Sequence, residues 1–187
     1  KMTIIGITGS IASGKTTVAQ LSAKRKYPLF DADKIVLNLY KNKNFVNLLI
    51  KKFKLKNRKN IKKQIRELIK ENRSVLSKLE SIIHPLVRKK MISFLKTKDK
   101  ILILEVPLLI ENKLSKYFDK IIFVDAKKKL RLKRYLKRNN DQKIFETLDK
   151  NQLSPVVKKK ASDLMINNNY SLAILKKSVK KFIEKYE

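Results

Sequence analysis

One segment near the N-terminus constrains the fold more than any other part of the sequence. It follows a short apolar run, Thr3 to Thr8, and it matches the P-loop pattern of Gly, four residues, Gly, Lys and then Ser or Thr at every fixed position. Its residues are Gly9, Ser10, Ile11, Ala12, Ser13, Gly14, Lys15 and Thr16. Such a loop turns backbone N–H groups around a phosphate and leads into a helix N-terminus. The sequence therefore predicts an α/β fold with a phosphate-binding loop after the first strand.

Apolar runs and helical patterns alternate along the rest of the chain, which is typical of a parallel sheet covered by helices. The expected strands cover residues 3–8, 27–30, 101–106, 120–125 and 164–166, and the clearest helices cover residues 15–25, 127–138 and 171–186. Residues 33–97 show several helices and no convincing strand. Residues 139–160 are helical in pieces. The 187 residues suffice for one domain with a substantial core.

The composition limits the function classes. With no Cys and a single His, disulfides and thiolate zinc sites are excluded and a His-based metal site is improbable. No apolar run reaches membrane-spanning length, and we expect no signal peptide. A net charge of +31 is compatible with a polyanionic partner. Because the excess is mostly Lys spread along the whole chain, we favour biased residue usage over a nucleic-acid interface.

Acidic residues near the expected strand ends suggest how the loop is used. In a P-loop, Lys15 reaches the β- and γ-phosphates of a nucleoside triphosphate and the Thr16 hydroxyl ligates Mg²⁺. Asp33 follows the second strand, where a carboxylate is placed to accept the proton of an attacking hydroxyl, and we give Asp31 a supporting or helix-capping role. Glu105 ends a strand and is expected to hold Mg²⁺ through water.

Basic residues form two further candidates. Arg134 and Arg138 lie four apart on the basic helix that also carries Arg131, and we expect this pair to contact phosphate oxygens. His84 precedes Pro85, and two interpretations stay open for it. Either His84 is an N-cap with Pro85 at the first helical position, or His84 and Arg88 share a helix face that contacts an anionic acceptor.

Taken together, these motifs resemble one family, dephospho-coenzyme A kinase, over nearly the whole chain. The matching segments are Gly6 through the P-loop, Asp31-Ala32-Asp33-Lys34-Ile35, Arg58, Leu79-Glu80, His84-Pro85-Leu86-Val87-Arg88, Val106-Pro107-Leu108-Leu109-Ile110-Glu111, Tyr117-Phe118-Asp119, Arg134 with Arg138, Gln152, and Asp163 with Asn167. The resemblance implies a nucleotide-kinase-like three-layer α/β/α sandwich. Its core would be residues 1–32, 98–126 and 161–187, its helical acceptor-binding part residues 33–97, and its lid residues 127–160.

The resemblance also implies the reaction, in which ATP phosphorylates the ribose 3′-hydroxyl of dephospho-coenzyme A. Lys15, Asp33 and Arg138 would be catalytic. The contacts of ATP would be Gly9, Ser10, Ile11, Ala12, Ser13, Gly14, Lys15, Thr16, Thr17, Arg134, Arg138 and Asn167. The contacts of the acceptor would be Asp33, Arg58, His84, Pro85, Arg88, Pro107 and Leu108. Thr16 would hold Mg²⁺ directly and Glu105 would hold it through water.

At three positions the sequence departs from the pattern of this family, one of them Lys54, which stands where a glycine usually follows Phe53. Glu105 stands where the family has Asp, and Leu148 stands where an Arg is expected in the lid. We expect an active cytoplasmic enzyme all the same, monomeric or a small homo-oligomer, with no membrane and no specific nucleic-acid partner. The alternatives are a P-loop kinase of another acceptor such as a nucleoside monophosphate, a nucleic-acid-binding P-loop ATPase, and a non-catalytic nucleotide-binding module.

Overall fold

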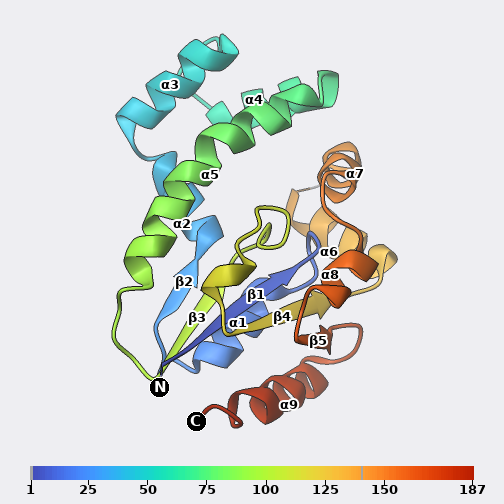
Figure 1. Ribbon diagram of the computed structural model, residues 1–187. Coiled ribbons are helices and arrows are strands. Elements are labelled where there is room, and N and C mark those ends of the chain that lie inside the picture. Colours follow the sequence, from blue (N-terminus) through green and yellow to red (C-terminus); the bar gives the residue numbers. More distant parts are fainter. Residues whose placement is uncertain (1, 140) are drawn as a thin grey trace. The chain divides into compact units, whose positions relative to one another are not determined.

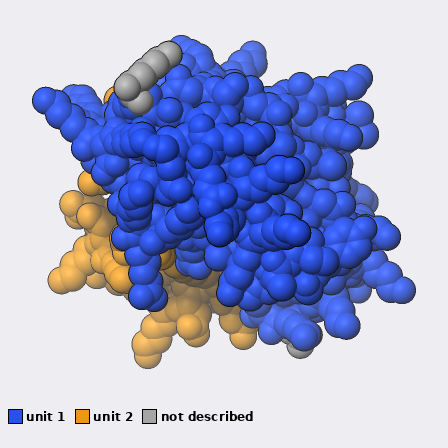
Figure 2. All heavy atoms as spheres, turned by 90° about the horizontal axis from the view of Figure 1, so that it is seen from below, with its two compact units in different colours: residues 1–31, 94–187 blue, residues 32–93 orange. Residues whose placement is uncertain are grey.

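The computed structural model describes residues 2–139 and 141–187 of the chain. The chain divides into two compact units, one made of residues 1–31 and 94–187 and the other of residues 32–93, which Figure 2 shows in different colours. Within the described residues, none of the helices has the length and apolar character that crossing a membrane requires.

The first unit is built on a parallel sheet of five strands in the order β2-β3-β1-β4-β5 (Figure 1). The strands are β1 (Thr3–Gly9), β2 (Leu29–Asp31), β3 (Ile101–Glu105), β4 (Lys120–Asp125) and β5 (Leu164–Asn167). All four neighbouring pairs run parallel, so the carboxyl ends of the strands lie at one edge. This confirms the predicted α/β fold with a parallel sheet, and it places the P-loop and Glu105 at that same edge.

Apolar residues bury both faces of the sheet, as parallel sheets require. On one face Ile5 and Ile7 of β1 join a core cluster with α1 (Lys15–Ala23) and α9 (Leu172–Ile183). On the other face alternate strand residues such as Leu104 and Phe123 are buried as well, and α8 (Pro155–Lys160) lies against β4. Helices therefore cover both faces, in the expected three-layer arrangement (Figure 1).

The short 3-10 helix η1 (Ser115–Tyr117) of this unit precedes β4. The helices α6 (Lys128–Asn139) and α7 (Gln142–Lys150) follow β4. Side chains cap three helices at their start: Asp141 accepts from the backbone N–H of Ile144, Ser154 from that of Val157, and Ser171 from that of Ile174. These caps satisfy N–H groups that the first helical turn leaves without a partner.

The boundaries of β2 and α9 differ from those predicted. β2 begins at Leu29 rather than residue 27, because Tyr27 is buried in the core cluster and pairing starts only where the Pro28 carbonyl accepts from the Ile103 N–H. α9 starts after its cap, Ser171, and ends at Ile183 instead of residue 186. Both corrections move an end by one to three residues and leave the order of elements unchanged.

Two acidic residues hold the amino ends of central strands. An Asp119 side-chain oxygen accepts from the backbone N–H of Ile4 at 2.8 Å, and one of Asp163 accepts from that of Ile121 at 2.8 Å. Both residues belong to segments on which the family resemblance rests. In this structure they connect chain segments at the sheet edge opposite to the P-loop, so we assign them to the fold and not to chemistry.

The second unit is entirely helical in its described elements. It contains α2 (Ala32–Leu39), α3 (Lys43–Phe53), α4 (Ile61–Glu71) and α5 (Ser74–Phe94), whose last residue already belongs to the first unit. Ile61, Ile65 and Ile69 of α4 recur every four residues and are all buried, which is the pattern of an amphipathic helix.

The interpretation of His84 as an N-cap is wrong. α5 runs without interruption from residue 74 to residue 94, so His84 and Pro85 lie in its interior. Pro85 has no N–H to donate within the helix, but the eleven residues before it and the nine after it keep the helical conformation. His84 and Arg88 are therefore one turn apart on a continuous helix, as the other interpretation requires.

Replacing Phe182 should measurably destabilise the first unit. Its side chain is only 6% exposed in the core cluster, and its ring centre lies 5.1 Å from that of Tyr186. We expect Phe182→Ala to lower the free energy of unfolding by about 3 kcal/mol or more, which is typical for a cavity left by Phe. The matched control is the exposed neighbour Lys181→Ala, and denaturant unfolding monitors both variants. Equal stability of the two variants would contradict the assigned core.

Candidate active site

The P-loop connects the end of β1 to the start of α1 and depends on its glycines. Gly14 has a φ of 99°, and a Cβ atom there would lie 2.2 Å from the side-chain nitrogen of Asn168. A Cβ atom on Gly9 would lie 2.5 Å from the Val124 carbonyl oxygen. Glycine at both positions lets the backbone N–H groups turn toward a phosphate without a clash from a side chain. The structure adds that the protein itself leaves no room for a side chain at either position.

The two P-loop residues predicted to handle phosphate and metal lie at the start of α1. Lys15 is buried, and its ammonium donates to the Ser10 carbonyl at 3.1 Å. The Thr16 hydroxyl donates to Glu105 at 2.8 Å. Glu105 is buried at the end of β3, and Asp31 of β2 is its partner in the strand register. Carboxylates from two neighbouring strands therefore end at the edge where α1 begins, which favours cation binding there.

Arg134 of α6 and Asn168 hold one side of the P-loop. Asn168 donates from its side-chain amide to the Ser13 carbonyl at 2.8 Å, and Arg134 reaches the same carbonyl at 3.4 Å. Arg134 also donates to the backbone carbonyl of Asn168 at 2.9 Å. Burial, and secondarily the positive charge of Arg138, lowers the pKa of Arg134. An added anion would offset both effects, so this is a favourable place for a phosphate oxygen.

Arg131 and Gln152 hold the other side of the loop through the peptide groups of Ile11. The Ile11 carbonyl accepts from the Arg131 guanidinium at 3.2 Å, and the Ile11 N–H donates to Gln152 at 3.1 Å. Arg131 is 4% exposed, also donates to the Ala126 carbonyl, and pairs with Asp149 at 2.6 Å. Its guanidinium lies over the Phe145 ring at 5.8 Å. The α6–α8 segment, residues 128–160, is thus bonded directly to the P-loop.

Sequence reasoning placed Arg131 on the basic helix but did not select it. Its spacing of three from Arg134 was the available signal, because residues three apart share a helix face. Asn168 was also missed, and the neighbouring Asn167 was chosen instead. Asn167 is exposed, and its side chain accepts from the backbone and side chain of Asn169. A run of three asparagines gives no sequence signal for which one faces the loop.

A buried ion pair fixes α8 to the segment after β3. Lys158 is fully buried and lies 2.6 Å from Glu111, which also accepts from the Leu153 N–H at 3.1 Å. Burial lowers the pKa of Lys158, and the hydrogen bond to Glu111 opposes that shift. Removing one partner of such a pair leaves an uncompensated buried charge, so the pair specifies where the end of the α6–α8 segment docks.

The other predicted site residues of the first unit lie at the same sheet edge or on α6. Pro107 and Leu108 follow β3, and the Pro107 carbonyl accepts from the Thr8 hydroxyl at 3.0 Å. Thr17 is half-buried in the first turn of α1, and Arg138 is exposed in the last turn of α6. Leu148 is half-buried on α7.

The predicted acceptor residues of the second unit lie on three segments. Asp33 is exposed in the first turn of α2, Arg58 is exposed just before α4, and His84, Pro85 and Arg88 lie on α5. Asp31 and Asp33 therefore belong to different units although only Ala32 separates them. The roles of these residues remain predictions.

The residues at the P-loop edge suit a magnesium ion. Thr16 and Glu105 offer a hydroxyl and a carboxylate 2.8 Å apart, and oxygen ligands of this kind are those that Mg²⁺ prefers. Across residues 2–139 and 141–187 there is no group of three or more His, Cys, Asp or Glu side chains placed to hold a metal.

Comparison with known proteins gives one consistent family. The family model described as dephospho-CoA kinase matches residues 3–173. A dephospho-CoA kinase from Fusobacterium nucleatum subsp. nucleatum is 38% identical, with 97% of each chain covered. Among solved structures, TT1252 from Thermus thermophilus has a TM-score of 0.76 at 27% identity, covering 98% of this chain and 97% of that one. A dephospho-CoA kinase from Campylobacter jejuni has a TM-score of 0.68 at 26% identity, covering 97% and 96%.

Replacing Arg131 should weaken nucleotide binding although the residue is not expected to touch the nucleotide. In Arg131→Gln the Ile11 carbonyl loses a charged donor, and such a bond is worth about 1.5–3 kcal/mol. We expect the affinity for ATP, measured by calorimetric titration, to fall about tenfold or more. The ATP affinity of Arg131→Lys should lie between those of Arg131→Gln and the unmodified protein, because lysine keeps the charge but lacks the planar guanidinium with its several donors.

The matched control for Arg131 is Lys133→Gln, an exposed cation on the same helix. It should bind ATP like the unmodified protein. Thermal unfolding of all three variants separates a loss of fold from a loss of loop geometry. If Arg131→Gln and Lys133→Gln bind ATP equally well, the contact of Arg131 with the P-loop does not contribute to ATP binding. Its role would then be limited to the ion pair with Asp149 that connects α6 to α7.

Proposed function

Because this chain belongs to the dephospho-CoA kinase family, we propose that it transfers the γ-phosphoryl group of ATP to the ribose 3′-hydroxyl of dephospho-coenzyme A. The products are coenzyme A and ADP. The observation that carries this proposal is the match of residues 3–173 to that family, together with a P-loop whose Lys15 and Thr16 lie at the start of α1. The chain and its relatives also agree in length, since 97% of each is covered in the comparison with the Fusobacterium protein.

The first unit supplies the groups for ATP. The N–H groups of residues 9–16 and the N-terminus of α1 favour the negative phosphates. Lys15 now donates to the Ser10 carbonyl and would exchange that contact for the β- and γ-phosphates. Burial and the charge of Arg138 lower the pKa of Arg134, and a nearby phosphate would offset both effects. Arg138 would add charge stabilisation as the phosphoryl group moves.

Magnesium fits beside these groups. Thr16 would ligate it directly and Glu105 would hold it through water, as an acidic strand-end residue does in other P-loop proteins. When bound, Mg²⁺ neutralises charge on the phosphates. Glu105 is one methylene longer than the Asp expected here, and its buried carboxylate already reaches the Thr16 hydroxyl at 2.8 Å. The longer side chain is therefore compatible with the role.

The acceptor hydroxyl needs a base, because it is a weak nucleophile at neutral pH. We assign this role to Asp33. As the 3′-oxygen forms its bond to the γ-phosphorus, the bond between that phosphorus and the β–γ bridging oxygen breaks. The bridging oxygen leaves as part of ADP. The proton of the hydroxyl passes to the Asp33 carboxylate. Arg58, His84, Pro85 and Arg88, with Pro107 and Leu108, are the proposed contacts of the rest of the acceptor.

The proposed setting is the cytoplasm, with ATP and dephospho-coenzyme A as the partners. The enzyme would act as a monomer or a small homo-oligomer. We assign no specific nucleic-acid partner, because the family match accounts for the chain without one and the lysines are spread over the whole sequence. Binding to DNA or RNA should then be weak and should vanish near physiological salt.

Turnover with a panel of acceptors tests the reaction. ADP release is measured with dephospho-coenzyme A, AMP, CMP and single-stranded DNA, and we expect high turnover only with dephospho-coenzyme A. Lys15→Ala should lower that turnover about a hundredfold, since its charge is worth most where negative charge develops. Preference for a nucleoside monophosphate, or ATP hydrolysis stimulated by DNA, would replace the proposal with another P-loop activity.

The two aspartates that flank Ala32 should differ in their effects. Asp33→Asn keeps the size of the side chain and removes the basic site, so turnover should fall about a hundredfold while ATP affinity stays the same. Asp31→Asn changes a buried residue at the end of β2 and should mainly lower stability. Steady-state kinetics and thermal unfolding of both variants check this. Reversed effects would make Asp31 the base.

A further inference from the structure

Glu111 and Gln152 belong to segments on which the family resemblance rests, and neither is among the residues assigned to ATP or to the acceptor. Both contribute to the turn between α7 and α8. Gln152 is half-buried in this turn and reaches the P-loop, while Glu111 accepts a hydrogen bond from the residue that follows Gln152. The turn therefore joins the loop that binds phosphate to the segment after β3.

The part of the P-loop that Gln152 contacts has a backbone that needs support from outside the loop. Ala12 has a φ of 57°, in the left-handed region, where a side chain makes the backbone less stable than at negative φ. The Ser13 N–H bends back to the Ser10 carbonyl at 3.1 Å. Ile11 lies within this bend, and its N–H and its carbonyl both bond to side chains from outside the loop. The conformation around Ile11 thus depends on those side chains.

A closed ring of contacts holds Ile11. Its carbonyl accepts from Arg131, which pairs with Asp149. The Asp149 backbone carbonyl accepts from the Gln152 N–H at 3.3 Å, and the Gln152 side-chain oxygen accepts from the Ile11 N–H at 3.1 Å. Ile11 is therefore held on both sides by residues whose own positions are fixed to one another.

The chemistry of the contact defines what Gln152 does. An N–H group can only donate, so the Ile11 N–H needs the oxygen of the Gln152 amide and not its nitrogen. A side chain that contacted the phosphates directly would instead have to be a donor. Gln152 therefore acts on the loop as an acceptor, and its effect on a nucleotide passes through the shape of the loop.

The Glu111–Lys158 ion pair fixes the turn that carries Gln152. Lys158 is fully buried, and its ammonium lies 2.6 Å from a Glu111 carboxylate oxygen. The same oxygen accepts from the backbone N–H of Leu153, directly after Gln152, at 3.1 Å. One carboxylate thus holds the chain at two points, beside Gln152 and in α8. A buried pair resists displacement, because separation would leave an uncompensated charge.

We infer that Gln152 is a positioning residue for ATP binding, and that Glu111 acts through it by fixing the turn after α7. This inference rests on the proposed function, in which ATP is the ligand of the P-loop. Without Gln152 the loop around Ile11 loses its acceptor, so ATP is bound more weakly although Gln152 does not touch it. The groups assigned to the chemical step, Lys15 and Asp33, stay in place, so the KM for ATP changes and kcat does not.

The test replaces Gln152 in two ways. Gln152→Leu removes the acceptor and should weaken ATP binding about tenfold, measured by calorimetric titration without an acceptor substrate. The KM for ATP should rise by a similar factor, with kcat within about twofold of the unmodified enzyme. Gln152→Glu keeps an oxygen for the Ile11 N–H and should bind ATP within about threefold of the unmodified protein. A direct contact with phosphate predicts the opposite order, because Glu has no donor and repels the phosphates.

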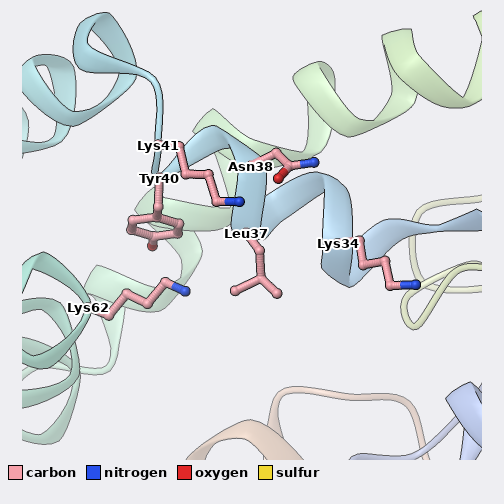
Figure 3. A pocket seen from close by; sticks show the side chains of 6 residues that line it. All are labelled: Lys34, Leu37, Asn38, Tyr40, Lys41 and Lys62. Atoms are coloured by element: carbon pink, nitrogen blue, oxygen red, sulfur yellow. The ribbon is translucent and has the colours of Figure 1, made fainter.

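Two matched controls carry the same change from an amide to leucine. Gln142→Leu alters an exposed glutamine of α7. Asn38→Leu alters one of the side chains around the hollow in the second unit that Figure 3 shows. Both should bind ATP like the unmodified protein. Thermal unfolding of every variant separates a loss of fold from a change in the loop.

Two double variants test whether Glu111 acts through Gln152. Glu111→Gln with Lys158→Met and Glu111→Leu with Lys158→Met both remove the ion pair without leaving a lone buried charge. Only the first keeps an oxygen for the Leu153 N–H, so ATP affinity should be lower by about threefold or more in the second. When both chains also carry Gln152→Leu, the difference should vanish, because residues that act through one another are not additive.

Three outcomes overturn the inference. Unchanged ATP affinity in Gln152→Leu would show that the loop keeps its conformation without this side chain. Equal losses in Gln152→Leu and Gln152→Glu would make Gln152 a direct contact of the nucleotide. Equal affinity of the two Glu111 double variants would limit Glu111 to the fold, and this comparison is decisive even if Gln152→Leu does not fold. A failed reaction proposal looks different, because then the unmodified enzyme does not turn over dephospho-coenzyme A, whereas these comparisons need only ATP binding.

Discussion

The outward-facing carbonyl groups of the P-loop are the constraint on which much of the first unit depends. A loop that turns its N–H groups toward a phosphate must turn carbonyls away from it, and buried carbonyls need donors. The Arg131 guanidinium donates to the Ile11 carbonyl, and the side chains of Arg134 and Asn168 donate to the Ser13 carbonyl. These donors come from α6 and from the residue after β5, so the loop has its shape only where those elements have docked.

The same contacts explain why the α6–α8 segment carries so much charge and yet packs against the core. Arg131 is buried because Asp149, the Ile11 carbonyl and the Phe145 ring surround it. Lys158 is buried because Glu111 meets it at 2.6 Å. Each buried cation has a specific partner, which fixes the docking of α7 and α8 more narrowly than apolar contacts alone. A strongly basic sequence therefore coexists with an ordered phosphate-binding edge.

Residues of the family pattern divide into two groups in the structure. Asp119, Asp163 and Glu111 bond backbone N–H groups or a buried lysine and maintain the fold. Lys15, Thr16 and Glu105 gather at the carboxyl edge of the sheet, where ligands bind in parallel α/β folds. Asp31 and Asp33 stand at the change from one unit to the other. The short Asp-Ala-Asp segment thus links a buried strand end to the first turn of α2.

The sequence by itself determined the parallel α/β fold, the P-loop and the edge at which Glu105 lies, because these follow from local patterns: apolar runs, a fixed glycine spacing and strand ends. Tertiary structure alone decided that Asn168, and not Asn167, holds Ser13, and that Arg131 is buried while Arg138 is exposed. It also decided that α5 continues through Pro85. The contacts of Asn168 with Ser13 and of Arg131 with Ile11 join residues more than a hundred positions apart, and such residues leave no local signal that they meet.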